Sequence, residues 1–159
     1  MSHPNEEIIN KFYSSFAAKN AQGMIECYSD DVHFNDPVFK NLVGIKAKAM
    51  WQMLIERSSG LDLKFSNITA NDTTGSADWV AEYNFSKTGR KIVNRIHAEF
   101  TFENGKIKTH NDTFSLWKWA GMALGFKGYL LGFTPIVQNQ IRKEAVGGLE
   151  LYMKRKRIK

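Results

Sequence analysis

Three side chains in this sequence are of types that carry acid–base chemistry and occur beside apolar residues: Asp36, His110 and Asp112. Asp36 ends the stretch Val32-His33-Phe34-Asn35-Asp36, which alternates as a short strand does and places the carboxylate on the same face as two apolar side chains. If that face is turned toward a core, loss of water raises the pKa of Asp36 and makes it a candidate general base or acid. The alternative is a turn-forming aspartate, because Asp-Pro is a common turn dipeptide.

His110 and Asp112 lie two positions apart in a segment that we predict as a strand from Ile107 to Trp117. Alternate residues of a strand share one face, so both side chains are expected on the same side as Phe114. An inward-facing histidine beside an aspartate is a candidate acid–base pair, and a hydrogen-bonded structural pair is the alternative. The candidate catalytic residues are therefore Asp36, His110 and Asp112.

Other chemistries lack their sequence signals. The chain has no His-x-His, no His-Glu-x-x-His and a single cysteine, Cys27, so neither a metal site nor an internal disulfide is expected. Glycine-rich nucleotide-binding loops and the Gly-x-Ser-x-Gly motif are also absent. Cys27 lies among helix-forming residues with no activating neighbour and is not expected to be a nucleophile. No cofactor and no metal are predicted.

The elements that must position the candidate residues alternate between helical and strand periodicity. Helices are expected over residues 5–19, after Asn20, from Gly44 onward, and after Thr134-Pro135, which is typical of a helix start. Strands are expected over residues 63–70, 76–85, 92–103 and 107–117, and Asn104-Gly105 is typical of a hairpin turn. Consecutive strands with short turns predict an antiparallel sheet, and helices followed by a sheet predict an α+β domain.

Strand alternation also sorts the side chains of the two middle strands. One face of 92–103 is apolar and is expected inside, whereas the other carries Arg95, His97 and Glu99 and is expected outside. The expected inward residues are Ile92, Ile96, Ala98, Phe100 and Phe102 from this strand and Trp79, Ala81, Tyr83 and Phe85 from 76–85.

Composition indicates one globular domain: 159 residues, of which 43% are hydrophobic and 24% charged. The formal net charge of +6 comes mostly from the last six residues, five of which are basic; the rest of the chain has 17 basic against 16 acidic residues. A nearly neutral body does not indicate a nucleic-acid partner. The N-terminus lacks the pattern of a signal peptide, and the most apolar stretch, 121–137, contains Lys127 and is short for a membrane span, so we expect a cytoplasmic protein.

The run from Tyr28 to Pro37, together with Phe12-Tyr13, resembles the front of the nuclear transport factor 2-like superfamily, which includes ketosteroid isomerases, SnoaL-like polyketide cyclases and limonene-epoxide hydrolases. Gly44-Ile45, Thr88-Gly89-Arg90 and Asn104-Gly105-Lys106-Ile107 fit the same pattern, and the resemblance spans residues 5–117. It implies a cone-shaped α+β fold, with a curved antiparallel sheet packed against N-terminal helices. We expect a cone domain over 1–117 and, in the same structural unit, a helical extension over 118–159 that closes the cone mouth or extends a dimer interface.

When the catalytic residues of these enzymes are placed on this sequence one by one, only some of the positions carry a matching residue. The catalytic base of the isomerases matches Asp36, but their two oxyanion donors fall on Phe12 and Ala98, which cannot donate a hydrogen bond. Steroid isomerisation by that mechanism is therefore not expected. Asp112 resembles the final-strand aspartate of the epoxide hydrolases, but the Arg-x-Asp that they also need is replaced by Trp79-Val80-Ala81-Glu82.

The leading hypothesis is a SnoaL-like protein that binds a small hydrophobic or polycyclic molecule in an apolar pocket. Proton-transfer chemistry (isomerisation, cyclisation or dehydration) would use Asp36 as the base, with His110 and Asp112 as acid or orienting groups. The expected ligand-binding residues are Phe12, Phe34, Trp51, Trp79, Tyr83, Ala98, Phe100 and Phe114.

Two other classes of function remain open. The missing oxyanion donors favour a non-catalytic ligand carrier or a homodimeric interaction module, and the resemblance implies a homodimer through the outer sheet face near Arg95, His97 and Glu99. A peripheral membrane protein that uses the apolar tail and the basic end ranks third. From the sequence alone, neither a nucleic-acid partner nor membrane association is expected.

Overall fold

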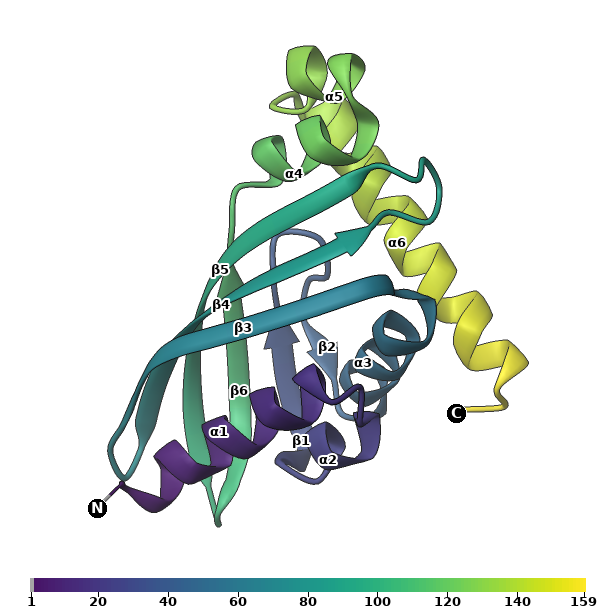
Figure 1. Cartoon of the computed structure of the whole chain (residues 1–159). Coiled ribbons are helices and arrows are strands. Elements are labelled where there is room, and N and C mark those ends of the chain that lie inside the picture. The colour runs from purple at the N-terminus through teal and green to yellow at the C-terminus, as the bar shows by residue number, and fades with distance from the viewer. Residues whose placement is uncertain (1) are drawn as a thin grey trace.

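The computed structural model describes residues 2–159, apart from the side chain of Ser59, as six helices and one six-stranded sheet (Figure 1). The helices are α1 (Pro4–Ala17), α2 (Ala21–Ile25), α3 (Ile45–Arg57), α4 (Leu116–Leu124), α5 (Phe126–Leu131) and α6 (Pro135–Arg155). The strands are β1 (Tyr28–Asn35), β2 (Leu42–Val43), β3 (Ser59–Ala70), β4 (Thr74–Asn84), β5 (Lys91–Glu103) and β6 (Lys106–Thr113).

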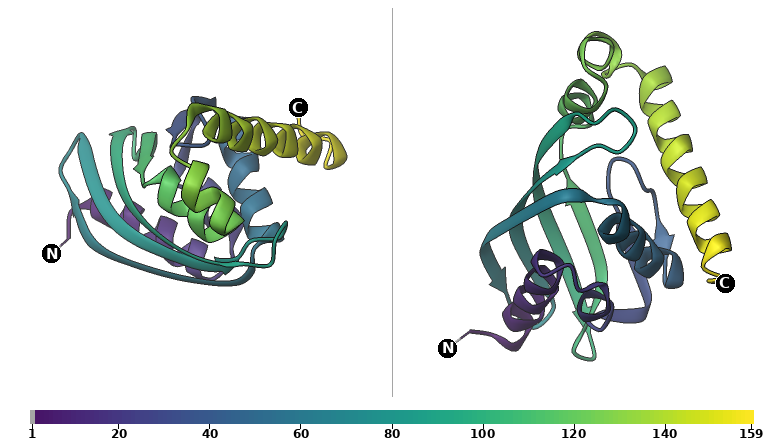
Figure 2. Two further views of the ribbon diagram at one scale, coloured as in Figure 1. Left: turned by 90° about the horizontal axis from the view of Figure 1, so that it is seen from above. Right: turned by 45° about the vertical axis from the view of Figure 1, so that its right-hand side comes forward.

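The sheet has the strand order β2-β1-β6-β5-β4-β3 and is strongly curved, so that it wraps around the N-terminal helices (Figure 2). The pairs β3–β4, β4–β5 and β5–β6 are antiparallel, as their short connections predict. The tight turn between β5 and β6 has positive φ angles at Asn104 and Gly105, as expected for an Asn-Gly hairpin. β1 is the exception and runs parallel to β6; α3 and four strands separate the two in sequence, which leaves enough chain for a parallel connection. The predicted α+β cone is confirmed.

Three strand boundaries differ from the sequence prediction by four residues: the starts of β1 and β3 and the end of β6. β1 begins at Tyr28 rather than Val32, because pairing with β6 and β2 outweighs the turn-forming character of Ser29-Asp30-Asp31. The short strand β2 was not predicted. β6 ends at Thr113 rather than Trp117, because the Ser115 side chain accepts a hydrogen bond from the Lys118 N–H and caps α4.

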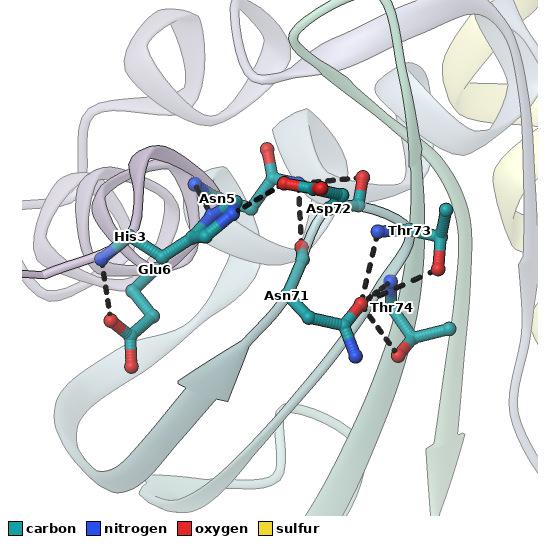
Figure 3. Close-up of polar contacts among 7 residues, drawn as sticks. All are labelled: His3, Asn5, Glu6, Asn71, Asp72, Thr73 and Thr74. Carbon is teal, nitrogen blue, oxygen red and sulfur yellow. Dashed lines mark hydrogen bonds and ion pairs between the residues drawn. The ribbon is translucent and has the colours of Figure 1, made fainter.

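The start of α1 is tied to the turn between β3 and β4 (Figure 3). The His3 N–H donates to Glu6 and the His3 ring accepts from the Asn5 N–H, which satisfies the free donors of the first turn. The Asn5 amide then donates to the carbonyl oxygens of Asn71 and Asp72 at 2.9 and 3.2 Å. These bonds fix α1 across the concave side of the sheet.

The core forms between α1, α3 and the concave face of the sheet. Phe16 packs against Trp51 and Trp79 with ring centroids 5.2 and 5.5 Å apart. The alternation predicted for β5 is confirmed: Ile92, Ile96, Ala98 and Phe100 are buried, whereas Arg95, His97 and Glu99 are exposed.

The C-terminal helices lie against the open side of the cone (Figures 1 and 2). Arg142 of α6 donates to the Pro37 carbonyl at 2.8 Å, and Glu144 pairs with Lys87 of the β4–β5 turn at 2.9 Å. The same turn holds α4, because Arg90 donates to the Met122 carbonyl at 2.8 Å. Of the two expectations for the extension, coverage of the cone mouth therefore agrees with the structure. Across residues 2–159, no helix is both long enough and apolar enough to cross a membrane.

Candidate functional site

A cavity of about 350 Å³ lies between the concave sheet, α3 and the C-terminal helices. This volume falls in the range of sites that bind small molecules. Most of its wall is apolar and includes Phe16, Trp51, Leu61, Trp79, Phe85, Ile96, Phe114, Trp119, Leu124 and Ile141. The polar groups that reach it include Asp36, Arg57, Tyr83, Asn94, Asp112 and Glu144.

Asp36 follows the end of β1 and enters the cavity wall from the loop that leads to β2. Its Oδ1 atom accepts hydrogen bonds from the backbone N–H groups of Val38 and Phe39, at 2.7 and 2.6 Å. The Oδ2 atom has no hydrogen-bond partner among the described residues. Asp36 therefore combines the two roles considered from the sequence. One carboxylate oxygen stabilises a turn, and the side chain also lines the apolar cavity.

The surroundings of Asp36 favour its protonated form. Burial raises its pKa to about 7, and the nearby carboxyl group of Asp112 acts in the same direction. The two backbone hydrogen bonds and the charge of Lys40 oppose the shift but do not cancel it. Near neutral pH, comparable fractions of Asp36 are therefore ionised and protonated, which suits a group that accepts and returns a proton.

A second polar group in the cavity is the hydroxyl of Tyr83. Its oxygen accepts a hydrogen bond from the Trp119 indole N–H at 3.0 Å, which leaves the hydroxyl proton free to be donated. Burial raises the pKa of Tyr83, and the charge of Asp36 raises it further, so the two groups lie within electrostatic reach. Asn94 also lines the cavity, and its side-chain amide has no hydrogen-bond partner among the described residues.

His110 and Asp112 belong to a hydrogen-bonded chain that starts in the core and ends at the cavity. Trp51 Nε1 donates to the Tyr28 hydroxyl at 2.8 Å, and that hydroxyl lies 2.7 Å from His110 Nδ1. His110 Nε2 lies 2.8 Å from Asp112 Oδ1, which also accepts from Trp79 Nε1 at 3.4 Å. A neutral His110 with its proton on Nε2 satisfies every link, with Tyr28 as donor to Nδ1. Burial raises the pKa of Tyr28 well above its ordinary value and keeps the hydroxyl neutral.

The two members of the predicted His110–Asp112 pair have different positions. His110 is 0% exposed and lies outside the cavity wall. Aromatic rings enclose it, with Phe100, Phe34 and Phe12 at centroid distances of 4.5, 5.0 and 5.4 Å. Asp112 is nearly as buried but reaches the cavity. His110 is thus placed to hold Asp112 and not to contact a molecule in the cavity.

The predicted ligand-binding residues fall into two groups. Trp51, Trp79, Tyr83 and Phe114 line the cavity together with Asp36. Phe12, Phe34, Ala98 and Phe100 are buried in the core behind it, because their strands and helix pack directly against one another there.

Sequence reasoning missed several cavity residues. Asn94 had a usable signal, because it shares strand parity with the buried residues Ile92 and Ile96. Trp119 and Glu144 had none, because they come from α4 and α6, and nothing in the sequence placed those helices over the cone.

No cluster of three or more metal-ligating side chains occurs in the described part of the chain. Burial raises the pKa of the Cys27 thiol to about 11, so the reactive thiolate is scarce at neutral pH.

Comparisons with known proteins agree with this geometry. The family model of the SnoaL-like domain matches residues 9–110. A proposed polyketide cyclase from Xanthomonas campestris pv. campestris is 20% identical with a TM-score of 0.61, covering 73% of this chain and 93% of its own. An LEH-like epoxide hydrolase from M. tuberculosis is 16% identical with a TM-score of 0.63, covering 84% of this chain and 95% of its own.

The protein TerC, co-crystallized with polyporic acid, is 17% identical with a TM-score of 0.60, covering 71% of this chain and 92% of its own. These identities are low enough that the similarity establishes the fold and not a shared reaction. No curated protein matches the sequence. The family match over residues 9–110 and the cone-shaped sheet together establish that this chain belongs to the SnoaL-like family of the nuclear transport factor 2-like superfamily.

Proposed function

We propose that the cavity binds a small, mostly hydrophobic molecule bearing a carbonyl or hydroxyl group, and that Asp36 moves a proton on it. One observation carries the proposal: Asp36 lies in an apolar cavity with a pKa raised to about 7 and with one carboxylate oxygen fixed by two backbone N–H groups. Such a group is poised between its two protonation states at neutral pH.

The chemistry divides between two side chains. The ionised Asp36 removes a proton from the ligand, and the Tyr83 hydroxyl donates a hydrogen bond to the oxygen on which negative charge then develops. Trp119 holds the Tyr83 oxygen from the other side, which orients the hydroxyl proton. The reaction class is proton transfer leading to isomerisation, cyclisation or dehydration. The polyketide cyclase and epoxide hydrolase folds among the structural neighbours are compatible with this class.

Tyr83 offers a hydrogen-bond donor in place of the two oxyanion donors that this sequence lacks. The oxyanion donors of the ketosteroid isomerases fall on Phe12 and Ala98, and both side chains lie in the core outside the cavity wall. A donor is nevertheless present on β4, at a different place in the cone. The proposed site therefore uses the base of the isomerases with another source of hydrogen bonding.

A non-catalytic ligand carrier is the second candidate, and it is favoured by the apolar residues at both family donor positions. The two functions differ in whether a bound molecule leaves chemically changed. The test is to incubate the protein with steroids, polyketide-like aromatics, terpenoid epoxides and fatty acids and to analyse the products by mass spectrometry. A ligand that binds and is converted supports the enzyme, whereas a ligand that binds and is always recovered intact supports the carrier.

Tyr83→Phe separates donation by the hydroxyl from wall packing. We expect kcat to fall by roughly 10²-fold or more with little change in KM, because the donor acts on charge that develops during the reaction. The free energy of unfolding should fall by only about 1 kcal/mol, because one hydrogen bond is lost and the aromatic ring remains. Tyr129→Phe, which removes an exposed hydroxyl, is the control. Unchanged kcat in Tyr83→Phe would exclude the donor role.

A further inference from the structure

The end of the molecule formed by α4, α5 and the start of α6 exposes large apolar side chains. Among the described residues, seven of the eleven exposed large hydrophobic side chains lie between Trp117 and Ile136. We call them the apolar tip: Trp117, Phe126, Tyr129, Leu130, Leu131, Phe133 and Ile136. Phe126 is 77% exposed and Ile136 is 82% exposed. Clustering of this kind marks an interaction surface, whereas scattered apolar side chains do not.

The packing of α4 against α5 explains why these side chains face outward. A Cβ on Gly128 would lie 2.0 Å from the Ala120 carbonyl oxygen, and one on Gly132 would lie 2.7 Å from the Ala120 Cβ. The two helices thus meet through glycine and alanine at a separation that leaves no interior for larger groups. The large residues of α5 therefore project away from the contact.

The apolar tip is one ordered surface. The Trp117 indole donates to the Tyr129 carbonyl oxygen at 2.8 Å, and its ring lies 6.2 Å from those of both Tyr129 and Phe133. Figure 1 shows α4 and α5 projecting beyond the sheet at one end of the molecule, and the right panel of Figure 2 shows the same projection.

The charged residues in the stretch of sequence that contains the apolar tip are all basic. No aspartate or glutamate occurs in the sequence between Asp112 and Glu144, whereas Lys118 and Lys127 lie within this stretch and are exposed. Neither lysine forms an ion pair with a described residue. A symmetric dimer through the apolar tip would bring both lysines of each copy to one interface, with no acidic residue from this stretch to neutralise them. An anionic lipid surface supplies the opposite charge to both.

We propose that the apolar tip docks on an anionic lipid membrane. Aromatic and aliphatic side chains enter the headgroup region, and Lys118 and Lys127 contact lipid phosphates. The sequence alone ranked this function third, because it did not reveal that the apolar residues of 121–137 are exposed together. Docking does not depend on what the cavity binds. Since Trp119 and Leu124 of α4 also line the cavity, docking places the cavity beside the lipid.

The test is flotation of the full chain with vesicles of phosphatidylcholine, with and without phosphatidylglycerol. We expect the wild type to float with the anionic vesicles and less with the neutral ones. Phe126→Ser combined with Phe133→Ser should lower the bound fraction by roughly ten-fold or more. Both side chains are exposed, so the fold should be retained, and circular dichroism checks this. Lys118→Glu combined with Lys127→Glu should remove the preference for anionic vesicles.

A matched control is Val146→Ser with Leu151→Ser, which removes two exposed apolar side chains of α6 away from the apolar tip. This variant should float as the wild type does. Three results would overturn the proposal. The first is no flotation at low salt, and the second is flotation that depends on the basic residues after Met153 and not on the apolar tip. The third is a wild-type dimer that the tip substitutions convert to a monomer without changing the fraction bound to vesicles. The last result would assign the apolar tip to a second copy of the chain.

Discussion

Asp36→Asn is expected to lose turnover and yet to unfold at a higher temperature than the wild type at alkaline pH. The loss of a general base should lower kcat by roughly 10²- to 10⁴-fold. Asparagine can still accept the hydrogen bonds of Val38 and Phe39 through its own Oδ1, so the loop should keep its shape. A ligand should therefore still bind.

The gain in stability follows from the direction of the pKa shift. The pKa of Asp36 rises from 3.8 to about 7 on folding, so the folded state holds the proton more tightly than the unfolded chain does. The stability that comes from this tighter binding of the proton is fully present below the pKa that Asp36 has in the unfolded chain. It is lost as pH rises through the pKa that Asp36 has in the folded protein. Above about pH 8 the ionised carboxylate of the wild type therefore costs up to about 4 kcal/mol, and asparagine removes that cost.

Thermal unfolding from about pH 4 to pH 8 measures this difference. The melting temperature of Asp36→Asn should exceed that of the wild type by roughly 5–10 °C at the upper end, and the gap should close toward the lower end. Asp62→Asn, at an exposed carboxylate on β3, is the matched control and should follow the wild type. A gap that does not change with pH would contradict the raised pKa, and full turnover would remove Asp36 from the mechanism.

His110→Leu is expected to be among the most destabilising single changes in the core. It leaves the buried Tyr28 hydroxyl without the acceptor for its proton and removes a hydrogen-bond donor from the buried carboxylate of Asp112. Each buried polar group left without its partner costs about 1–3 kcal/mol, and a charged group costs more, so a total loss of about 3–5 kcal/mol is expected. The melting temperature should fall by roughly 10 °C.

The control for this variant is His97→Leu on the outer face of β5. His97 forms a half-exposed ion pair with Asp78 at 2.7 Å, and such pairs contribute about 1 kcal/mol or less. Chemical denaturation of the two variants compares buried and exposed histidines directly. A His110→Leu protein that is as stable as His97→Leu but inactive would show that His110 acts on the ligand and not on the core.

Much of the fold can be read from the sequence, because alternation and turn chemistry are local. The parity of β5, the Asn104-Gly105 turn and the Thr134-Pro135 helix start all depend on a few adjacent residues. The beginning of β1 could not be read in this way, because its parallel pairing with β6 joins segments that are far apart in the chain.

The candidate site was predictable only in part, for the same reason. Asp36 and Asp112 are marked by their apolar neighbours, and both reach the cavity. Strand alternation predicts which face of the sheet a side chain lies on, but not how far along the cone it lies. Phe34 and Phe100 also face inward, yet they lie behind the cavity and not in its wall. The wall supplied by α4 and α6 depends on tertiary contacts such as Arg142 with Pro37.

The claim that the cavity is the ligand site is tested most directly by two neighbouring glycines of α6. Gly148 lines the cavity, and a Cβ added there would have only Arg57 within 4 Å, at 3.6 Å. A side chain on Gly147 meets nothing within 4 Å. Gly148→Phe should therefore block the cavity, whereas Gly147→Phe removes a helical glycine in the same way and leaves the cavity open.

The measurement is a thermal-shift titration of the wild type and these two variants with each compound of the panel. A ligand at about a hundred times its dissociation constant should add roughly 2.7 kcal/mol and raise the melting temperature by several degrees. We predict that rise for the wild type and Gly147→Phe, and its loss in Gly148→Phe. A ligand that raises the melting temperature of all three proteins equally would contradict the assignment of the cavity as its binding site.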